Sequence, residues 1–266
     1  MYTQNAARFL GFADLYDKAR PSVPLYPIKL LCNYLGHRPQ LVVDLGCGTG
    51  LSTQIWQENC DKAIGVDPNP DMLHVAQQKS NSVLSFQAGS GENTGLPDAL
   101  ADIVVCSQSF HWMEPQATLR EINRILQPNG IFAAIDCDWP AVTDWRAEKA
   151  YMDVYNKVKS FETTLPKIQD TFTRYPKTKH LTNMDQSGYF AYTREIVFVN
   201  QEPCSKERFR QMLLSQGGVQ AVLREYPDLI QHDLEKFQYT IDQIWSDETF
   251  EIEFCYRMRI GIKSSL

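Results

Sequence analysis

The stretch Val43-Asp-Leu-Gly-Cys-Gly-Thr-Gly50 begins inside a short apolar run and leads into a helical pattern. Glycines at such a place permit a tight turn and let a ligand approach the backbone closely. The free amides at the start of the following helix favour a negative group on that ligand. The stretch therefore predicts a strand, a turn and a helix, with a ligand site at the turn.

The spacing of these glycines separates the ligand classes. A dinucleotide site needs G-x-G-x-x-G, but Gly50 comes one residue early and Leu51 takes the required position. A P-loop needs Gly-Lys-Ser/Thr, which does not follow. Asp44 lies two residues before Gly46 and would repel a pyrophosphate, whereas a ligand with a cationic amino group and a sulfonium would be accepted there.

A second acidic residue follows the next apolar run. Ile64-Gly-Val-Asp67 ends that run, and Pro68 and Met72 come after it. A carboxylate at the end of a strand can accept hydrogen bonds from both ribose hydroxyls of an adenosine. Met72 can lie against the adenine.

The segment from residue 40 to about 138 alternates between short apolar runs and helical stretches. One helix is expected to begin at Pro70 with Asn69 as its N-cap, and another begins near Pro115 and ends at the turn Pro128-Asn-Gly130. The runs are nearly continuous and rich in β-branched residues, as in strands of a parallel sheet that are buried on both faces. They cover residues 41–45, 63–66, 83–86, 103–106 and 131–135.

The pattern changes after Trp139. We expect a helix over residues 145–159, a strand over 193–199, a helix capped by Ser205 and a helix from Pro227, with a polar stretch of no clear periodicity over 177–187. Residues 250–262 alternate strictly between apolar and mostly polar side chains. One polar face suits an antiparallel strand near a sheet edge. Such a strand could also pair with a strand of a second subunit.

These patterns together predict an α/β fold. The sheet is Rossmann-like, doubly wound and mostly parallel, with an antiparallel last strand and a helical cap inserted after the fifth strand. The expected organisation is an N-terminal helical segment over 1–39, a cofactor-binding core over 40–140, a helical cap or substrate region with a returning core strand over 141–245, and a C-terminal core strand over 246–266.

Composition excludes several classes of protein. The chain has 266 residues, of which 43% are hydrophobic and 22% charged, as in ordinary globular domains. Its net charge of −6 argues against a nucleic-acid partner. The seven cysteines are odd in number and form no CxxC pair, so we expect reduced thiols and no metal site. Because no signal-like or membrane-spanning apolar segment is present, a cytoplasmic protein without a membrane partner is expected.

The two acidic motifs closely resemble the first two motifs of class I S-adenosylmethionine-dependent methyltransferases. The resemblance extends in order over roughly residues 9–138, about half of the chain, and its N-terminal part is similar to the type 11 subgroup. The further matching stretches are Ala13–Tyr16, Arg20-Pro21, Tyr26-Pro27, Gly89–Glu92, Leu96-Pro97, Ala101–Ser107 and Arg124–Gly130.

This resemblance implies S-adenosylmethionine as the cofactor and S-adenosylhomocysteine as the product. Arg20 would bind the cofactor carboxylate, although it could equally be a solvated charge. The family often has an acidic residue near the adenine amino group where this chain has Ser90. The residues that the resemblance places at the cofactor are Tyr16, Arg20, Asp44, Gly46, Cys47, Gly48, Gly50, Asp67, Pro68, Met72, Ser90, Gly91 and Ser107.

Four further residues follow the fourth and fifth expected strands, at the sheet edge where open α/β sheets bind ligands. His111 could be a general base, or it could orient its loop or touch the cofactor. Trp112 is expected to form a wall of the substrate pocket. Asp136 and Asp138 could hold a cationic substrate, act as bases, or cap the next helix.

The function expected from these features is methyl transfer to a small-molecule acceptor by in-line displacement, with an O, N, C or S nucleophile. Three alternatives stay open: a non-catalytic cofactor-binding or scaffold module, another adenosyl chemistry such as aminopropyl transfer, and a methyltransferase acting on RNA or protein. The sequence does not indicate which acceptor is methylated or the oligomeric state.

Overall fold

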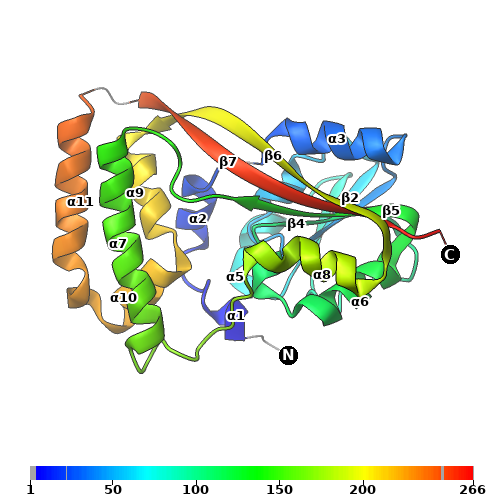
Figure 1. Ribbon diagram of the computed structural model, residues 1–266, viewed down its shortest axis with the longest axis horizontal. Helices are drawn as coiled ribbons and strands as arrows, with labels where there is room; N and C mark the ends of the chain where they lie inside the picture. The colour runs from blue at the N-terminus through cyan, green and yellow to red at the C-terminus, as the bar shows by residue number, and fades with distance from the viewer. Residues whose placement is uncertain (1–3, 22, 247–248, 266) are drawn as a thin grey trace.

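A seven-stranded sheet forms the centre of the molecule in the computed structural model, which describes residues 4–21, 23–246 and 249–265 (Figure 1). The strand order is β3-β2-β1-β4-β5-β7-β6. The helices and strands are α1 (Gln4–Ala7), α2 (Ala13–Ala19), α3 (Leu25–Leu35), β1 (Leu41–Leu45), α4 (Leu51–Gln54), β2 (Lys62–Asp67), α5 (Pro70–Gln77), β3 (Leu84–Ala88), β4 (Ala101–Ser107), η1 (Phe110–Trp112), α6 (Pro115–Ile125), β5 (Leu126–Cys137), α7 (Trp145–Thr164), η2 (Lys177–Lys179), α8 (His180–Ser187), β6 (Phe190–Ser205), α9 (Lys206–Leu214), α10 (Gly217–Glu225), η3 (Pro227–Leu229), α11 (Gln231–Ile244) and β7 (Thr249–Lys263).

The sheet is mixed, as the sequence predicts. Strands β1 to β5 pair in parallel, and β7 pairs antiparallel with both β5 and β6. Successive residues of β1 enter different cores: Val42 packs in the core that includes α3, and Val43 in the core that includes α6 and α8. This burial on both faces explains why the apolar runs are continuous rather than alternating.

Local signals set several helix boundaries. Helix α5 begins at Pro70, and the Asn69 side chain accepts hydrogen bonds from the backbone amides of the first turn. Helix α9 is capped by Ser205, as predicted. The predicted turn at 128–130 is wrong as a boundary, because α6 ends at Ile125 and β5 already begins at Leu126. Asn129 keeps a left-handed φ of 63° inside this irregular first part of the strand.

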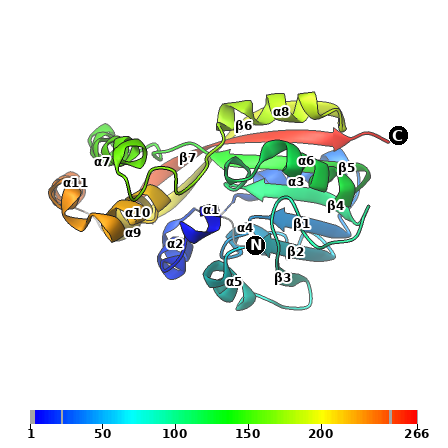
Figure 2. The ribbon, with the colours of Figure 1, turned by 90° about the horizontal axis from the view of Figure 1, so that it is seen from below.

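The predicted helical cap is present at one end of the sheet. Helices α7, α9, α10 and α11 form a group beside the sheet, and α1 and α2 lie between this group and the strands (Figures 1 and 2). The long strands β6 and β7 connect the two parts. Since β7 begins at the cap and runs antiparallel to β5, the carboxyl ends of the parallel strands face the cap. Ligand sites in open α/β sheets lie at these ends.

Two expectations for the second half of the chain change. Strand β7 lies one position inside the sheet edge, and β5 and β6 occupy both of its sides, so it is not available to a second subunit. The polar stretch 177–187 contains helix α8, whose Met184 is fully buried against the sheet. Positions 1–3, 22, 247–248 and 266 of the expected terminal segments lie outside the described residues.

The seven cysteines are free thiols, in agreement with the expectation from their number and spacing. Within the described residues, no helix combines the length and the apolar character that crossing a bilayer requires.

Candidate active site

The glycine loop joins β1 to α4 with three left-handed residues. Gly46, Gly48 and Gly50 have φ values of 69°, 54° and 85°. A Cβ atom at Gly48 would meet nothing within 4 Å, so this part of the backbone faces open space. A Cβ atom at Gly46 would lie 2.5 Å from Cβ of Ser109, so the loop after β4 packs directly on it. The loop is therefore supported from one side and open to a ligand on the other.

Asp44 lies beneath this loop rather than on the wall of a cavity. Its Oδ2 accepts hydrogen bonds from the hydroxyls of Ser52 and Thr53, at 2.6 and 2.7 Å, and the residue is fully buried. Burial raises its pKa to about 6. Gly50 is also away from the cavity, and a Cβ atom there would lie 2.9 Å from the ring of Phe86. These two residues hold the loop, and the structure does not bring them to the cofactor cavity.

Asp67 ends β2 at the opening of the loop. Its Oδ2 accepts a hydrogen bond from the Gly48 amide at 2.9 Å, and its Oδ1 accepts one from the Asn69 amide at 2.8 Å. Burial raises its pKa to about 6, so the group is mostly ionised at neutral pH. Each carboxylate oxygen has a second lone pair that can accept a hydrogen bond from a ribose hydroxyl.

Burial raises the pKa of the Cys47 thiol, in the glycine loop, well above its usual value, which disfavours a reactive thiolate.

A cavity of about 160 Å³ opens beside the loop, and most of the predicted cofactor residues line it. The predicted residues that line the cavity are Tyr16, Arg20, Gly46, Cys47, Gly48, Asp67, Pro68, Met72, Ser90, Gly91, Ser107 and Trp112, and the sequence reasoning missed Asn5, Phe9, Glu92, Gln108, Met113 and Trp139 among others. Of the missed lining residues, Pro21, Thr49 and Glu92 belong to motifs that the sequence analysis recognises.

Arg20 lies at one end of this cavity with part of its guanidinium unsatisfied. Its Nη2 donates hydrogen bonds to the Ser215 carbonyl and to Gln216 Oε1, at 3.0 and 3.2 Å, and its Nε has no hydrogen-bond partner. The guanidinium carbon lies 4.8 Å from the Tyr16 ring centroid and 4.9 Å from that of Trp139. No carboxylate of the described chain is within ion-pair distance. The free N–H groups of Arg20 can therefore donate hydrogen bonds to the carboxylate of S-adenosylmethionine, while the Asp67 carboxylate can accept them from the ribose.

A second cavity, of about 350 Å³, adjoins the first on the side of the helical cap. Helix α7, residues 174–177 and the start of α10 form its outer walls. His111 and Asp138 line it, whereas Asp136 lines neither cavity. The two cavities share Phe9, Tyr16, Arg20, Gln108, Trp112, Cys137 and Trp139 as lining residues.

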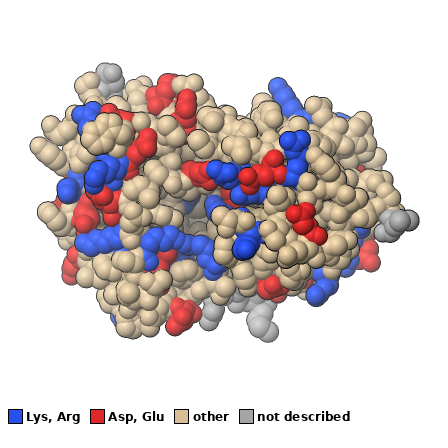
Figure 3. All heavy atoms as spheres, viewed as in Figure 1, with Lys and Arg blue, Asp and Glu red and all other residues tan. Residues whose placement is uncertain are grey.

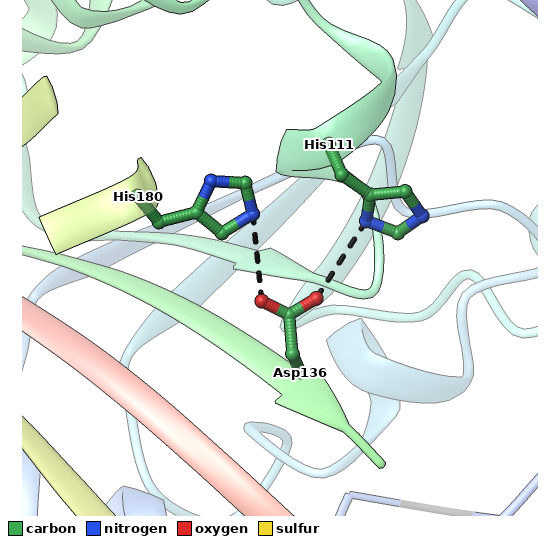
Figure 4. A group of neighbouring side chains, drawn as sticks. All are labelled: His111, Asp136 and His180. Carbon is green, nitrogen blue, oxygen red and sulfur yellow. Dashed lines mark ion pairs between the residues drawn. The ribbon is translucent and has the colours of Figure 1, made fainter. Parts of the chain in front are cut away.

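Asp136 is the centre of a buried cluster (Figure 4). His111 Nδ1 and His180 Nε2 face its two carboxylate oxygens at 3.6 and 3.5 Å, from η1 and α8. The Lys177 ammonium is 3.1 Å and the Arg259 guanidinium 2.8 Å from the same carboxylate. Burial opposes ionisation of Asp136, but contact with His111 and the charge of Lys177 outweigh it and hold its pKa below its usual value. Asp136 thus has cationic partners within the protein.

The same cluster has the residue types of a metal site, since three possible ligand atoms lie within 4.8 Å of one another. Lys177 and Arg259 already neutralise Asp136, and a divalent cation would be repelled by both of them. Burial lowers the pKa of His111 to about 4, so its ring is neutral at pH 7. Asp136 favours a proton on Nδ1, which leaves Nε2 of His111 as an acceptor. The cluster is suited to orienting His111 rather than to holding a metal.

Asp138 has a different environment at the rim of the second cavity. Its Oδ2 accepts a hydrogen bond from Nε of Arg257 at 3.1 Å. The N-cap of α7 is Asp144, whose side chain accepts a hydrogen bond from the Arg146 amide. The predicted capping role of Asp136 or Asp138 is therefore wrong.

The fold and the site define a class of protein: a Rossmann-like domain that binds an adenosyl ligand with a carboxylate at one end. Residues 43–134 match the family described as methyltransferase domain, type 11. Similar proteins include an uncharacterized methyltransferase-like protein of Schizosaccharomyces pombe, 35% identical over 43% of this chain and 45% of its own length, and the probable S-adenosylmethionine-dependent methyltransferase CRG1 of Saccharomyces cerevisiae, 27% identical over 44% of this chain and 43% of its own.

Among solved structures, a putative type II methyltransferase from Anaeromyxobacter dehalogenans matches with a TM-score of 0.68 and 19% identity, over 93% of this chain and 98% of that one. This likeness shows the fold. Residues 43–134 of the chain thus form an S-adenosylmethionine-dependent methyltransferase domain of the type 11 family. The matched part spans just under half the length of the curated relatives.

Proposed function

We propose that the protein transfers the methyl group of S-adenosylmethionine to a small-molecule acceptor held in the second cavity, and that it does so in the reducing environment of the cytoplasm. The observation that carries this proposal is the wall common to both cavities, which includes Tyr16, Arg20, Trp112 and Trp139. A cofactor bound along the glycine loop and an acceptor under the cap would meet at this wall. Proximity and alignment are the main requirements of a displacement reaction.

When bound, S-adenosylmethionine supplies an activated methyl group, and the residues of this chain align the two reactants. The glycine loop and Asp67 fix the adenosyl part, and Arg20 fixes the carboxylate end. The aromatic rings of Trp112 and Trp139 exclude water from the common wall. His111, neutral and oriented by Asp136, accepts a proton when the acceptor group carries one.

The helical cap favours a small acceptor over RNA or protein. Its helices α7 and α10 contribute walls of the second cavity, so the acceptor site lies under the cap rather than on an open surface. The net charge of −6 is also unfavourable for RNA. Arg20, available to a carboxylate, favours the intact cofactor over the decarboxylated one that aminopropyl transfer needs.

The test is formation of S-adenosylhomocysteine from S-adenosylmethionine with a panel of small metabolites. Turnover with an acceptor supports the proposal over a non-catalytic binding module, and binding of the cofactor without turnover of any compound in a broad panel contradicts it. His111→Gln should leave the affinity for S-adenosylhomocysteine unchanged and lower kcat by about 100-fold or more with a protonated acceptor group. An unchanged kcat would exclude His111 as the base.

A further inference from the structure

Positive charge predominates around the second cavity. In the space-filling view, lysine and arginine side chains lie below and beside the hollow in the middle of the face, and acidic and basic side chains are mixed along its upper side (Figure 3). Among the described residues, the acidic side chains that line this cavity are Glu162 and Asp138, and Asp138 is paired with Arg257. The lining cations are Arg20, Lys159, Arg174 and Lys177.

Glu162 cannot neutralise the cations that surround it. The carboxylate pairs with Arg8, with the Lys159 ammonium at 3.2 Å and with the Arg174 guanidinium at 3.3 Å. Its side chain is 4% exposed, whereas those of Lys159 and Arg174 are 34% and 28% exposed. Three positive charges thus share one negative charge, and two of the cations retain contact with the cavity.

Burial makes this excess of charge unfavourable in the free protein. It lowers the pKa of Arg8 to about 10, and it lowers the pKa of Arg174 as well. Nε and Nη1 of Arg8 are buried without hydrogen-bond partners. A negative group in the cavity would compensate these cations, and a positive group would add to their repulsion.

The N-terminus of α10 adds to the positive potential. Gly217, Gly218 and Val219 are its first residues and line the cavity, and Gln216 provides no side-chain cap. Its side chain instead donates a hydrogen bond to the Tyr151 hydroxyl at 2.7 Å. The two glycines let this helix start pack closely on the Arg8–Glu162 pair, because a Cβ atom at Gly217 would lie 3.0 Å from Nε of Arg8 and one at Gly218 would lie 2.6 Å from Oε1 of Glu162. The positive end of the helix dipole favours a negative group in the adjoining cavity.

The remaining wall is aromatic, so the acceptor site combines cations with an apolar surface. Trp112, Trp139 and Tyr155 line the cavity, and the Arg174 guanidinium carbon lies 4.7 Å from the Trp112 ring centroid. Such a site suits a small molecule with an apolar body and a charged end.

We infer that the second cavity binds its acceptor through a negatively charged group held by Lys159, Arg174 and the N-terminus of α10, so that the substrates are organic anions, either carboxylates or phosphate monoesters. The inference rests on the proposed methyl transfer. It replaces the expectation of a cationic substrate, because Asp136 and Asp138 already have cationic partners. Ion pairs to Lys159 and Arg174 stabilise the anionic group of the acceptor before reaction, which makes that group a poorer nucleophile. The anionic group therefore anchors the acceptor, and a second group of the same molecule takes the methyl.

Calorimetry on the protein saturated with S-adenosylhomocysteine tests this inference. The probes are straight-chain and aromatic carboxylic acids, each paired with its neutral amide, and phosphate monoesters, each paired with its alcohol. The expected result is that acids of one of these two series bind about tenfold or more tightly than their neutral partners. The series that binds identifies the anionic group.

Variants of the cavity wall complete the experiment. Arg174→Gln and Lys159→Gln should each weaken binding of the selected anion by about tenfold, with the affinity for S-adenosylhomocysteine unchanged. If Arg174→Gln does not fold, the more exposed Lys159 provides the test. Lys149→Gln, on the same helix in an exposed pair with Asp153, is the matched control and should bind as the unaltered protein does.

The inference is overturned if no acid in either series binds better than its neutral partner, or if both wall variants bind the anion as tightly as the control does. Those outcomes leave the proposed methyl transfer intact as long as S-adenosylhomocysteine binds. Absence of S-adenosylhomocysteine binding would instead contradict the proposed function itself.

Discussion

His180 should make the protein less stable at mildly acidic pH. The residue lies in α8, is fully buried, and has its Nε2 3.5 Å from Asp136. Burial lowers its pKa from 6.5 to about 4, and the charges of Arg259 and Lys177 oppose the effect of Asp136. At neutral pH the ring is therefore uncharged in the folded protein and largely uncharged in the unfolded protein.

The direction of the effect follows from these values. Because the folded pKa is lower than the unfolded one, protons bind preferentially to the unfolded chain, and stability is lost as the pH falls from about 6.5 towards 4. The full difference corresponds to about 3 kcal/mol, at about 1.4 kcal/mol per pH unit. Between pH 7 and pH 5, roughly 2 kcal/mol of this contribution should disappear.

Urea unfolding of the protein and of His180→Gln at pH 7 and pH 5 measures this contribution. Asp44 and Asp67 have raised pKa values and act in the opposite direction, since their burial favours the protonated form in the folded state. Both proteins contain them, so their effect cancels in the comparison. The free energy of unfolding of the variant, relative to the unaltered protein, should rise by about 2 kcal/mol on going from pH 7 to pH 5.

A matched variant distinguishes this effect from general acid sensitivity. His232 is exposed on α11, and His232→Gln should show the same pH dependence as the unaltered protein. If His180→Gln also shows the same difference in unfolding free energy at both pH values, the reasoning about the buried ring is refuted.

Two further predictions concern packing and charge. Gly65→Ala would place a Cβ atom 2.5 Å from the Phe86 ring, and it should destabilise the protein by roughly 1–3 kcal/mol in urea unfolding; an unchanged midpoint would show that the ring moves freely. Glu162→Gln would leave the buried Arg8 guanidinium without its carboxylate, and it should cost about 3–5 kcal/mol in the same assay; a loss below about 1 kcal/mol would show that the buried charge is solvated.

The cofactor half of the fold was predictable because its signals are local. Continuous apolar runs reveal strands buried on both faces, and the glycine spacing with Asp67 indicates the ligand at one turn. Asp44 shows the limit of this reasoning: its place before the glycines suggests a ligand contact, but the hydroxyls of Ser52 and Thr53 draw its side chain beneath the loop.

The acceptor half was not predictable in the same way, because its walls come from segments far apart in the chain. Arg8 meets Glu162 only after the cap has packed on the N-terminal segment, and Arg174 reaches the same carboxylate from a loop 12 residues further along the chain. A partial signal was present in α7, where Tyr155, Val158, Lys159 and Glu162 follow helical spacing and line the cavity together. The sequence of this helix does not show which charged residues of the opposite wall Lys159 and Glu162 will face.

Titration calorimetry with S-adenosylhomocysteine tests whether the glycine loop and Asp67 form the cofactor site. We expect saturable micromolar binding to the protein. Binding should weaken about 100-fold or more in Asp67→Ala through loss of the hydrogen bonds to the ribose, and it should stay unchanged in Asp61→Ala, whose carboxylate pairs with Arg38 on the surface. A folded protein that does not bind, or equal affinity in Asp67→Ala, would contradict the assignment of the cofactor site.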